Sequence, residues 1–595
     1  MSVTKVLSEM VSFVPVSGIT STNVQAAIPE SAANLASSIA APTGSSLIGY
    51  LPAGTGAVAT TVQTKLRTSV SVKDFGAVGN GIADDTASIQ AAIASLNGNP
   101  GTILFPSGTY KVTATCPCFA GQNFISEGAK LDVTSLNAPL FAYNNSGTLV
   151  FNFANPNPPS LISGFNVLGK AVNFVAGNTN FYLAYINRTP YVTIRDCKLT
   201  YAGCAHVTGE SILCNFENIH CYNPVSDSFT FDLGAGEFGP NACTFISCEV
   251  EEQKYYCNGI SIYAGTANLW GCQFESLTKC IYLNGSSTAV YVSNCNFGIR
   301  TMPDPTAIWV DSAYEVSVFN SQFTFGGRYP NTFAVNQIGL NINSVLTQLT
   351  FIGNNVSYTH DSTDSCIMFA IKGIDNGNIS ANFFDRSGSG TTTYMFDFGN
   401  SASYYYSGLF NNNNVLCEAG GAFAFTKTAA TLGYFGGAIS NNIFIRVTNF
   451  LNLAGALVSN NQFIGSASTI AYTAGNGFPL KNNVFSSTGW TITNGTSRDG
   501  NTGLTGSLAP QIQSNSASVI SLSAGTFANV VVPVPYPFSD ANYVAVATCS
   551  DTTYGATTIV VDHICQISAS QVTVTVKNNS AGTLSSTINV LFSHA

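Results

Sequence analysis

The chain has 595 residues and a formal net charge of −9, yet only 9% of its residues are charged, while 45% are hydrophobic and 11% aromatic. This composition excludes intrinsic disorder, which requires low hydrophobicity and high net charge. It also argues against a nucleic-acid partner, because phosphate binding requires clustered Lys and Arg and the sequence contains no such cluster.

Residues 1–68 are small and polar, and they predict an extended arm or a few short helices with little core of their own. The first ten residues lack a basic segment followed by an apolar one, so we expect no secretory signal and synthesis in the cytoplasm. The sequence has no apolar run long enough to cross a bilayer, so we expect no membrane insertion. In a reducing compartment the sixteen cysteines are expected to pack rather than to form disulfides.

The segment VSVKDFGAVGNGIADDTASIQAAI, at residues 70–93, predicts a strand, a glycine-rich turn and a short amphipathic helix. Either Asp84 or Asp85 is expected to cap this helix, and we interpret the pair as a cap and a turn rather than as catalytic acids. The helix is expected to cover the end of the strand-rich region that follows, which would otherwise expose unpaired strand edges. Residues 101–110 then predict a strand, a turn and a second strand.

Residues 69–506 carry a repeat, in which an apolar strand is followed by Asn or Cys, one variable residue and a large apolar residue. The last residue of each repeat, here called the anchor, recurs every 19 to 33 residues, which is about the length of one coil of a parallel β-helix. The sequence therefore predicts an all-β fold, a right-handed parallel β-helix in which residues 69–115 form the capping helix and the first strands. The anchors are Leu199, Ile219, Val250, Phe274, Phe297, Phe323, Val356, Phe384, Val415, Phe444, Phe463 and Phe485.

Two positions before the anchor, the early coils have Cys and the later coils have Asn. Because equivalent residues of stacked coils lie about 4.8 Å apart, the cysteines predict a buried column and the asparagines a hydrogen-bonded ladder. Zinc requires ligands that converge on one point, so we expect no metal and no other cofactor, although a disulfide or metal remains the alternative for the cysteines. The two sets are Cys197, Cys248, Cys272 and Cys295, followed by Asn354, Asn382, Asn413, Asn442, Asn461 and Asn483.

One position after the anchor, the predicted outward column contains Thr200, His220, Glu251, Glu275, Gly298 and Thr324. Two carboxylates on adjacent coils repel each other by about 3 kcal/mol at about 5 Å and an effective dielectric constant of about 20. Repulsion of this size favours one protonated and one ionised carboxyl, as a glycosidase requires. Glu251 and Glu275 are therefore the first candidate catalytic pair, with either retaining or inverting spacing still possible.

A second strand in each coil predicts two more outward columns, which are Thr230, Ser261, Tyr282 and Trp309, and then Asp232, Tyr263, Asn284 and Asp311. Asp232 and Asp311 form the second candidate catalytic pair. Outward aromatic rings stack on the apolar faces of sugars, and Arg300 is suited to pair with an acidic sugar. The predicted substrate-binding residues are His220, Tyr255, Tyr256, Tyr263, Tyr282, Arg300 and Trp309. A β-elimination lyase that uses a base such as His220, Lys254 or Lys279 remains the mechanistic alternative.

Residues 507–595 alternate between apolar and polar residues across several turn signals, and they predict a small C-terminal β-sandwich. We expect this domain to contribute to trimerisation or to carbohydrate contacts.

The segment at residues 70–93, together with FPSGTY at residues 105–110, resembles the opening motif of the pectate-lyase-like superfamily, in the version common in bacteriophage tailspikes. Asn80 replaces the Asp that is usual there, and residues 17–28 resemble the particle-facing part of such proteins. The resemblance implies a homotrimer of the phage virion that binds and depolymerises a capsular or lipopolysaccharide chain. It also implies that residues 1–68 attach the protein to the phage tail or to another spike. Endo-glycosidic hydrolysis is the expected reaction, and a non-catalytic receptor-binding spike remains the alternative from a different class.

Overall fold

The computed structural model describes most of the chain between residues 11 and 594. The described residues are 11, 14, 16–144, 158–170, 182–234, 239–251, 257–286, 288–299, 305–326, 337–359, 366–387, 393–398, 404–418, 423–427, 434–450, 453, 456–465, 469–470, 480–486, 491–492, 501, 512–522, 526–533, 543–551, 559–568, 571–578 and 584–594.

The N-terminal arm contains short helices and little buried surface. Helix α1 (Val24–Ala40) is capped by Asn23, whose side chain accepts a hydrogen bond from the backbone N–H of Ala26, and Ala27 is its one buried residue. The arm continues through η2 (Gly44–Ser46), β1 (Gly49–Tyr50), β2 (Thr60–Thr61) and α2 (Val62–Leu66). Among the described residues, none of the helices is both long and apolar enough to cross a membrane.

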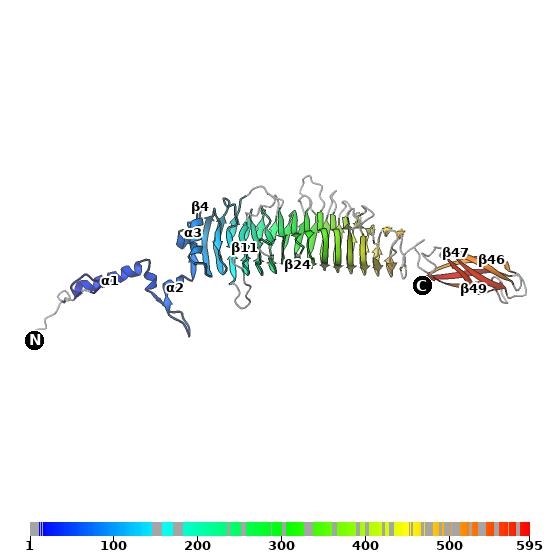
Figure 1. Ribbon diagram of the computed structural model, residues 1–595, viewed down its shortest axis with the longest axis horizontal. Coiled ribbons are helices and arrows are strands. Elements are labelled where there is room, and N and C mark those ends of the chain that lie inside the picture. The colour runs from blue at the N-terminus through cyan, green and yellow to red at the C-terminus, as the bar shows by residue number, and fades with distance from the viewer. Residues whose placement is uncertain are drawn as a thin grey trace.

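A long solenoid follows, in which the parallel strands of successive coils stack along one axis (Figure 1). It begins with β3 (Ser69–Ser71), η3 (Val72–Phe75), β4 (Asn80–Asp84) and α3 (Thr86–Ala94). A typical coil contributes one strand to each of three faces, which we number in chain order. Four longer strands each run through two faces, namely β5 (Gly101–Lys111), β7 (Gln122–Asp132), β29 (Gln337–Ile352) and β31 (Cys366–Ser380). This architecture confirms the predicted parallel β-helix.

The shorter strands of the three faces pair in register from coil to coil. The first face contains β9 (Ser160–Ser163), β12 (Val192–Arg195), β15 (Asn215–Glu217), β18 (Cys243–Ile246), β21 (Thr266–Trp270), β24 (Ala289–Ser293), β27 (Glu315–Phe319), β34 (Tyr405–Asn411), β37 (Tyr434–Ser440), β40 (Leu457–Ser459) and β43 (Leu480–Lys481). The second face contains β10 (Asn166–Leu168), β13 (Lys198–Thr200), β16 (His220–Tyr222), β19 (Glu249–Glu251), β22 (Gln273–Glu275), β25 (Asn296–Ile299), β28 (Gln322–Phe325), β30 (Asn355–Thr359), β32 (Phe383–Ser387), β35 (Asn414–Cys417), β38 (Ile443–Ile445), β41 (Gln462–Ile464) and β44 (Val484–Phe485). The third face contains β6 (Cys116–Cys118), β8 (Phe141–Asn144), β11 (Tyr182–Asn187), β14 (Gly203–Thr208), β17 (Phe229–Asp232), β20 (Asn258–Ile262), β23 (Lys279–Asn284), β26 (Thr306–Ser312), β33 (Thr393–Asp397), β36 (Phe423–Thr426) and β39 (Val447–Thr448). A separate parallel pair is formed by β42 (Thr469–Ile470) and β45 (Thr491–Ile492).

The predicted anchors stack on the second face with one exception. Cys221, and not Ile219, is the residue that pairs with Leu199 on one side and with Val250 on the other. Ile219 and Cys221 are both buried, so the pattern of inward apolar residues is the same for either register. A slip of two residues keeps every side chain on its own side of the sheet, and the prediction of Ile219 as an anchor was therefore wrong.

The turn between the first and second faces explains the repeat. Each turn has a residue with positive φ, commonly Asn, as in Asn412 (φ 54°) and Asn441 (φ 58°). Asn tolerates this left-handed conformation better than most residues. The residue that follows it points inward, and there the predicted ladder is confirmed. The backbone N–H and the side-chain amide of Asn354 both donate to Oδ1 of Asn382, and the same pattern repeats through Asn413, Asn442, Asn461, Asn483 and Asn501.

The predicted cysteine column lies in the equivalent positions of the earlier coils. Cys197, Cys248, Cys272 and Cys295 are buried and have free thiols, and Ile219 occupies the same position in the coil between the first two. These side chains therefore pack in the core, as expected.

Helix α3 covers the first coils through Ile89 and Ile93, which are both buried. Asp84 accepts hydrogen bonds from the backbone N–H and hydroxyl of Thr86 at the start of the helix and from the hydroxyl of Thr113. The bond from Thr113, followed by those from Thr86, holds the pKa of Asp84 below its usual value. Asp85 instead accepts from the backbone N–H groups of Val78 and Gly79 and fixes the glycine-rich turn. The expected break within residues 101–110 was wrong, because β5 continues through it and pairs with β3 and then with β4.

The C-terminal strands form two antiparallel three-stranded sheets, which confirms the predicted β-sandwich. One sheet has the order β46 (Ile512–Leu522), β51 (Leu584–His594) and β48 (Tyr543–Asp551), and the other has β47 (Phe527–Pro533), β50 (Gln571–Asn578) and β49 (Ile559–Ser568). Val572, Val574 and Val576 of one sheet and Val590 of the other are buried.

Candidate active site

The predicted glutamates lie on the second face, and the structure brings them together. Glu251 and Glu275 are direct register partners on β19 and β22, and each is partly exposed. The side-chain amide of Gln273 donates to Oε1 of Glu275 at 2.8 Å. The register neighbours that the sequence predicted are therefore present, and their catalytic role stays a prediction.

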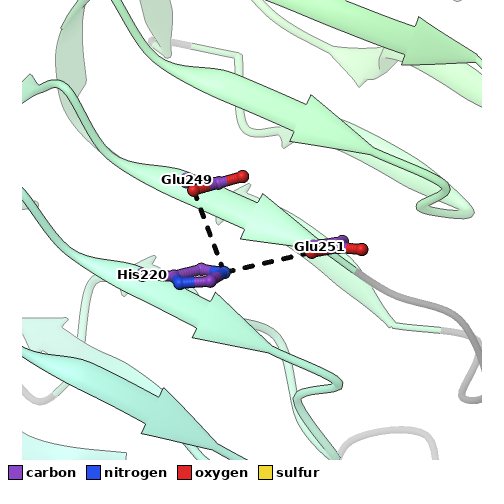
Figure 2. Close-up of side chains that lie close together, drawn as sticks. All are labelled: His220, Glu249 and Glu251. Carbon is purple, nitrogen blue, oxygen red and sulfur yellow. Dashed lines mark ion pairs between the residues drawn. The ribbon is translucent and has the colours of Figure 1, made fainter.

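His220 differs from its predicted place because of the two-residue slip described above. Its register partner on β19 is Glu249, while Tyr222 takes the place beside Glu251. Nε2 of His220 lies 3.9 Å from Oε2 of Glu249 and 4.0 Å from Oε2 of Glu251, so the ring points between the two carboxylates (Figure 2). We call His220, Glu249 and Glu251 the histidine–glutamate cluster.

A second group of polar and aromatic side chains lies on the third face. Thr230, Ser261, Tyr282 and Trp309 pair in register as predicted. Thr230 and Ser261 alternate with the core residues Phe229, Phe231, Ile260 and Ile262, so they lie on the outer side of the sheet as predicted, but both are buried there. The hydroxyl of Tyr182 bonds Thr230, and Ser261 donates to Asp227. The expected exposure of these two residues was therefore wrong, and only the later members of the column, Tyr282 and Trp309, are partly exposed.

Asp311 occupies a break in the regular pairing. Asn284 pairs with Ser312, and not with Asp311 as predicted, because the register shifts by one residue at this point. Asp311 accepts hydrogen bonds from Tyr282 Oη at 2.7 Å, Trp309 Nε1 at 2.8 Å and Asn343 Nδ2 at 3.0 Å. The irregularity thus allows one carboxylate to bind side chains from three coils.

Lys279 lies between the two aromatic rings of this group. Its Nζ is 4.1 Å from the centre of the Tyr282 ring and 4.3 Å from the centre of the Trp309 ring, the geometry of a double cation–π contact. Burial lowers the pKa of Lys279, and the charges of Asp311 and Asp227 partly offset that effect. One face of each ring is therefore covered by the ammonium group.

Two aspartates beside Lys279 have pKa values that are shifted in opposite directions. Burial raises the pKa of Asp227, and this effect exceeds the opposing hydrogen bonds from Ser261 and Asn258. Burial also acts to raise the pKa of Asp311, but the hydrogen bonds from Asn343, Trp309 and Tyr282 outweigh it and lower the pKa overall. Such a divergence is typical of an acid and a base that share one site. We call Asp227, Lys279, Tyr282, Trp309 and Asp311 the aspartate–aromatic cluster.

Asp232 and Tyr263 flank this cluster. Oδ2 of Asp232 lies 2.7 Å from Nε2 of His206, and its Oδ1 accepts from the backbone N–H of Gly234. The Tyr263 ring packs edge-on against Tyr282 with 5.7 Å between the ring centres. Burial raises the pKa of Tyr263, with Asp227 adding to the effect. Tyr255, Tyr256 and Arg300, also predicted to bind substrate, lie outside the described residues.

Asp227, His206 and Glu249 were not predicted as site residues from the sequence, and Lys279 was predicted only as a possible base. Asp227 lies two residues before the buried Phe229, just as Asn258 and Lys279 lie two residues before Ile260 and Ile281. Extending each predicted third-face strand by two residues towards the N-terminus would therefore have placed Asp227, Asn258 and Lys279 in one column.

Comparison with known proteins agrees with this architecture. Residues 69–302 match the model of the family described as rhamnogalacturonase A/epimerase, pectate lyase-like. A glutamate-to-glutamine mutant of the tailspike protein of E. coli bacteriophage HK620, solved in complex with a hexasaccharide, aligns with a TM-score of 0.50. That alignment has 13% sequence identity and covers 95% of this chain and 100% of the tailspike chain, and it shows a shared fold.

Several curated mannuronan C5-epimerases match over short segments. Mannuronan C5-epimerase AlgE4 of Azotobacter vinelandii is 56% identical over 62 residues, which is 10% of this chain and 11% of the epimerase. Mannuronan C5-epimerase AlgE5 of the same organism is 54% identical over 44 residues, 7% of this chain and 4% of that protein. The chain thus spans only a small part of the length of these curated relatives.

Proposed function

We propose that this chain, whose residues 69–302 match a pectate-lyase-like family model, is a phage tailspike that binds and depolymerises a bacterial surface polysaccharide. The proposed reaction is endo-glycosidic hydrolysis at the aspartate–aromatic cluster. The observation that supports this assignment is the pair of aspartates beside Lys279, one with a raised and one with a lowered pKa.

The proposed roles follow from these two environments. Asp227, which burial keeps protonated to higher pH, donates its proton to the glycosidic oxygen as the bond from that oxygen to the anomeric carbon breaks. Asp311, which its hydrogen bonds keep ionised, either accepts a proton from the attacking water or attacks the anomeric carbon itself. The anomeric form of the first product, measured by NMR, distinguishes the two routes.

The charge of the site supports a neutral or amino-sugar polymer as the substrate. With Asp227 protonated, the carboxylates of Asp232 and Asp311 still outnumber the single ammonium group of Lys279, which is already enclosed by two rings. A chain of acidic sugars would meet net negative charge here. The exposed ring of Tyr263 and the partly exposed rings of Tyr282 and Trp309 then offer apolar surface to a pyranose.

The experiment is a comparison of the two candidate carboxylate pairs in the full-length protein. Asp227→Asn and Asp311→Asn are each expected to lower the rate of formation of reducing ends from the host polysaccharide by about 10²–10⁴-fold. Glu251→Gln and Glu275→Gln, on the second face, are expected to retain activity within about threefold of the unchanged protein. The opposite pattern would assign catalysis to Glu251 and Glu275 instead.

The same assay separates the alternative functions. A receptor-binding spike without activity would bind the polysaccharide but release no reducing ends in any variant. A β-elimination lyase would give products that absorb ultraviolet light because of their new double bond. The lowered pKa of Lys279 suits a base for that reaction, yet two flanking aspartates disfavour the acidic sugar that it requires.

Assembly as a homotrimer on the phage tail completes the proposal. Ile28, Leu35 and Ile39 of α1 are exposed, and their spacing puts them along one side of the helix. This exposed apolar stripe supports a role of the arm in assembly and attachment, in which neighbouring chains would cover it. Light scattering on the full chain and on a chain lacking residues 1–68 measures the mass of each, and attachment is tested by the loss of the shortened chain from phage particles.

A further inference from the structure

The histidine–glutamate cluster is not used by the proposed reaction, and its geometry is that of a set of metal ligands. One ligand atom from each of His220, Glu249 and Glu251 lies within 4.8 Å of the other two. Glu249 and Glu251 are two residues apart on β19 and so project from the same side of that strand. His220 reaches the space beside them from β16 on the preceding coil (Figure 2).

Nε2 of His220 has two ion-pair contacts but no hydrogen-bond partner among the described residues. The atom is shielded from solvent and makes no hydrogen bond within the described part of the chain. Its distances to the two carboxylates, 3.9 and 4.0 Å, exceed those of a hydrogen bond. A buried ring nitrogen is costly without a partner, and here it points between two carboxylates that repel each other.

We propose that His220, Glu249 and Glu251 bind a divalent transition-metal ion of the zinc class. Any three atoms within 4.8 Å of one another have a common point no more than about 2.8 Å from each. Bringing each ligand atom from about 2.8 Å to the usual Zn–N and Zn–O distances of about 2.0–2.2 Å from that point requires a shift of about 0.6–0.8 Å per ligand. A nitrogen ligand favours zinc, nickel or copper over calcium and magnesium, which prefer sites made entirely of oxygen.

The bound ion would neutralise two neighbouring carboxylates and join consecutive coils of the second face. It would also leave a coordination position open to water, because the chain offers three ligands where zinc takes four. The site lies on a different face from the aspartate–aromatic cluster, so it does not depend on the proposed hydrolysis.

The test is a titration of the full-length protein with ZnCl₂ after treatment with EDTA and dialysis, using a chromophoric zinc indicator as competitor. We expect one ion per chain with micromolar or tighter affinity, and at least tenfold weaker binding by His220→Ala and by Glu249→Gln. The control is Glu315→Gln on the first face, whose carboxylate is already bonded by Tyr291 and Ser317 and which is expected to bind zinc like the unchanged protein.

Two further measurements make the result decisive. Circular dichroism establishes that each variant keeps its β-structure, so weaker binding is not mistaken for unfolding. Substitution with Co²⁺ gives a visible absorption band if a nitrogen and two oxygen ligands hold the ion. Binding of zinc by the unchanged protein weaker than about 0.1 mM, or equal affinity in His220→Ala, would overturn the proposal.

Discussion

The asparagine ladder allows a quantitative prediction, and Asn442→Ala is its clearest test. The side-chain amide of Asn442 donates to the carbonyl of Phe410 and to Oδ1 of Asn461, both at 2.9 Å. Its own Oδ1 accepts from the backbone N–H of Asn413 at 2.8 Å and from the Asn413 side chain at 3.1 Å. The side chain is fully buried, so water does not replace these bonds in the folded protein.

Removing the side chain therefore deletes four hydrogen bonds. At about 1 kcal/mol of net stabilisation per bond, the loss is about 4 kcal/mol, and the buried N–H of Asn413 left without a partner adds to it. A domain with an unfolding free energy of about 5–15 kcal/mol would lose a large part of its stability. Urea unfolding followed by far-ultraviolet circular dichroism measures the change.

The matched control is Asn441→Ala, one residue earlier in the same turn. Asn441 is exposed and has a positive φ of 58°, so its replacement changes the preference for that backbone conformation and leaves the ladder intact. We expect a loss of at most about 1 kcal/mol. If Asn442→Ala is destabilised no more than Asn441→Ala, the ladder amides do not contribute to the stability of the coils.

Three more predictions concern the catalytic pH profile and the turns. Because the pKa of Asp227 is raised and that of Asp311 is lowered, activity is expected to fall at high pH as Asp227 ionises and at low pH as Asp311 is protonated. The value of kcat/KM should therefore be greater at pH 5 than at pH 8. The reverse order would contradict the assigned roles. Lys279→Met removes a positive charge that lowers the pKa of Asp227, so the fall of kcat/KM at high pH should move to higher pH. If this fall does not move, a group other than Asp227 limits the activity at high pH. Ala381 is exposed and has a φ of 56° in a turn where many other coils have Asn. Ala381→Asn should therefore raise the unfolding free energy by about 0.5–1 kcal/mol. A lower stability of this variant in urea would refute the preference of the turn for Asn at positive φ.

The solenoid was predictable because its repeating unit has a local physical cause. A residue with positive φ followed by a small inward residue produces the same turn in coil after coil, and the ladder of Asn354 to Asn483 depends only on that repetition. The inward position of each anchor was also predictable, since apolar residues alternate with polar ones. The alternation does not fix the position of each anchor along its strand, because a slip of two residues preserves it. Ile219 and Cys221 differ by such a slip.

The candidate site was harder to predict because it lies where the repetition fails. Stacking like on like suits amides, which donate and accept along the column, but a column of identical carboxylates accumulates repulsion. An acid beside a base instead requires unlike groups on neighbouring coils. At the start of the third-face strands Asn258 pairs with Lys279, and Asp227 bonds to Asn258 from the coil before. At the end of these strands the register shift lets Asp311 bond Tyr282 and Trp309. In a fold built by repetition, chemistry is therefore best sought where adjacent coils carry different residues or where their register shifts, since those are the places where groups of opposite charge meet across coils.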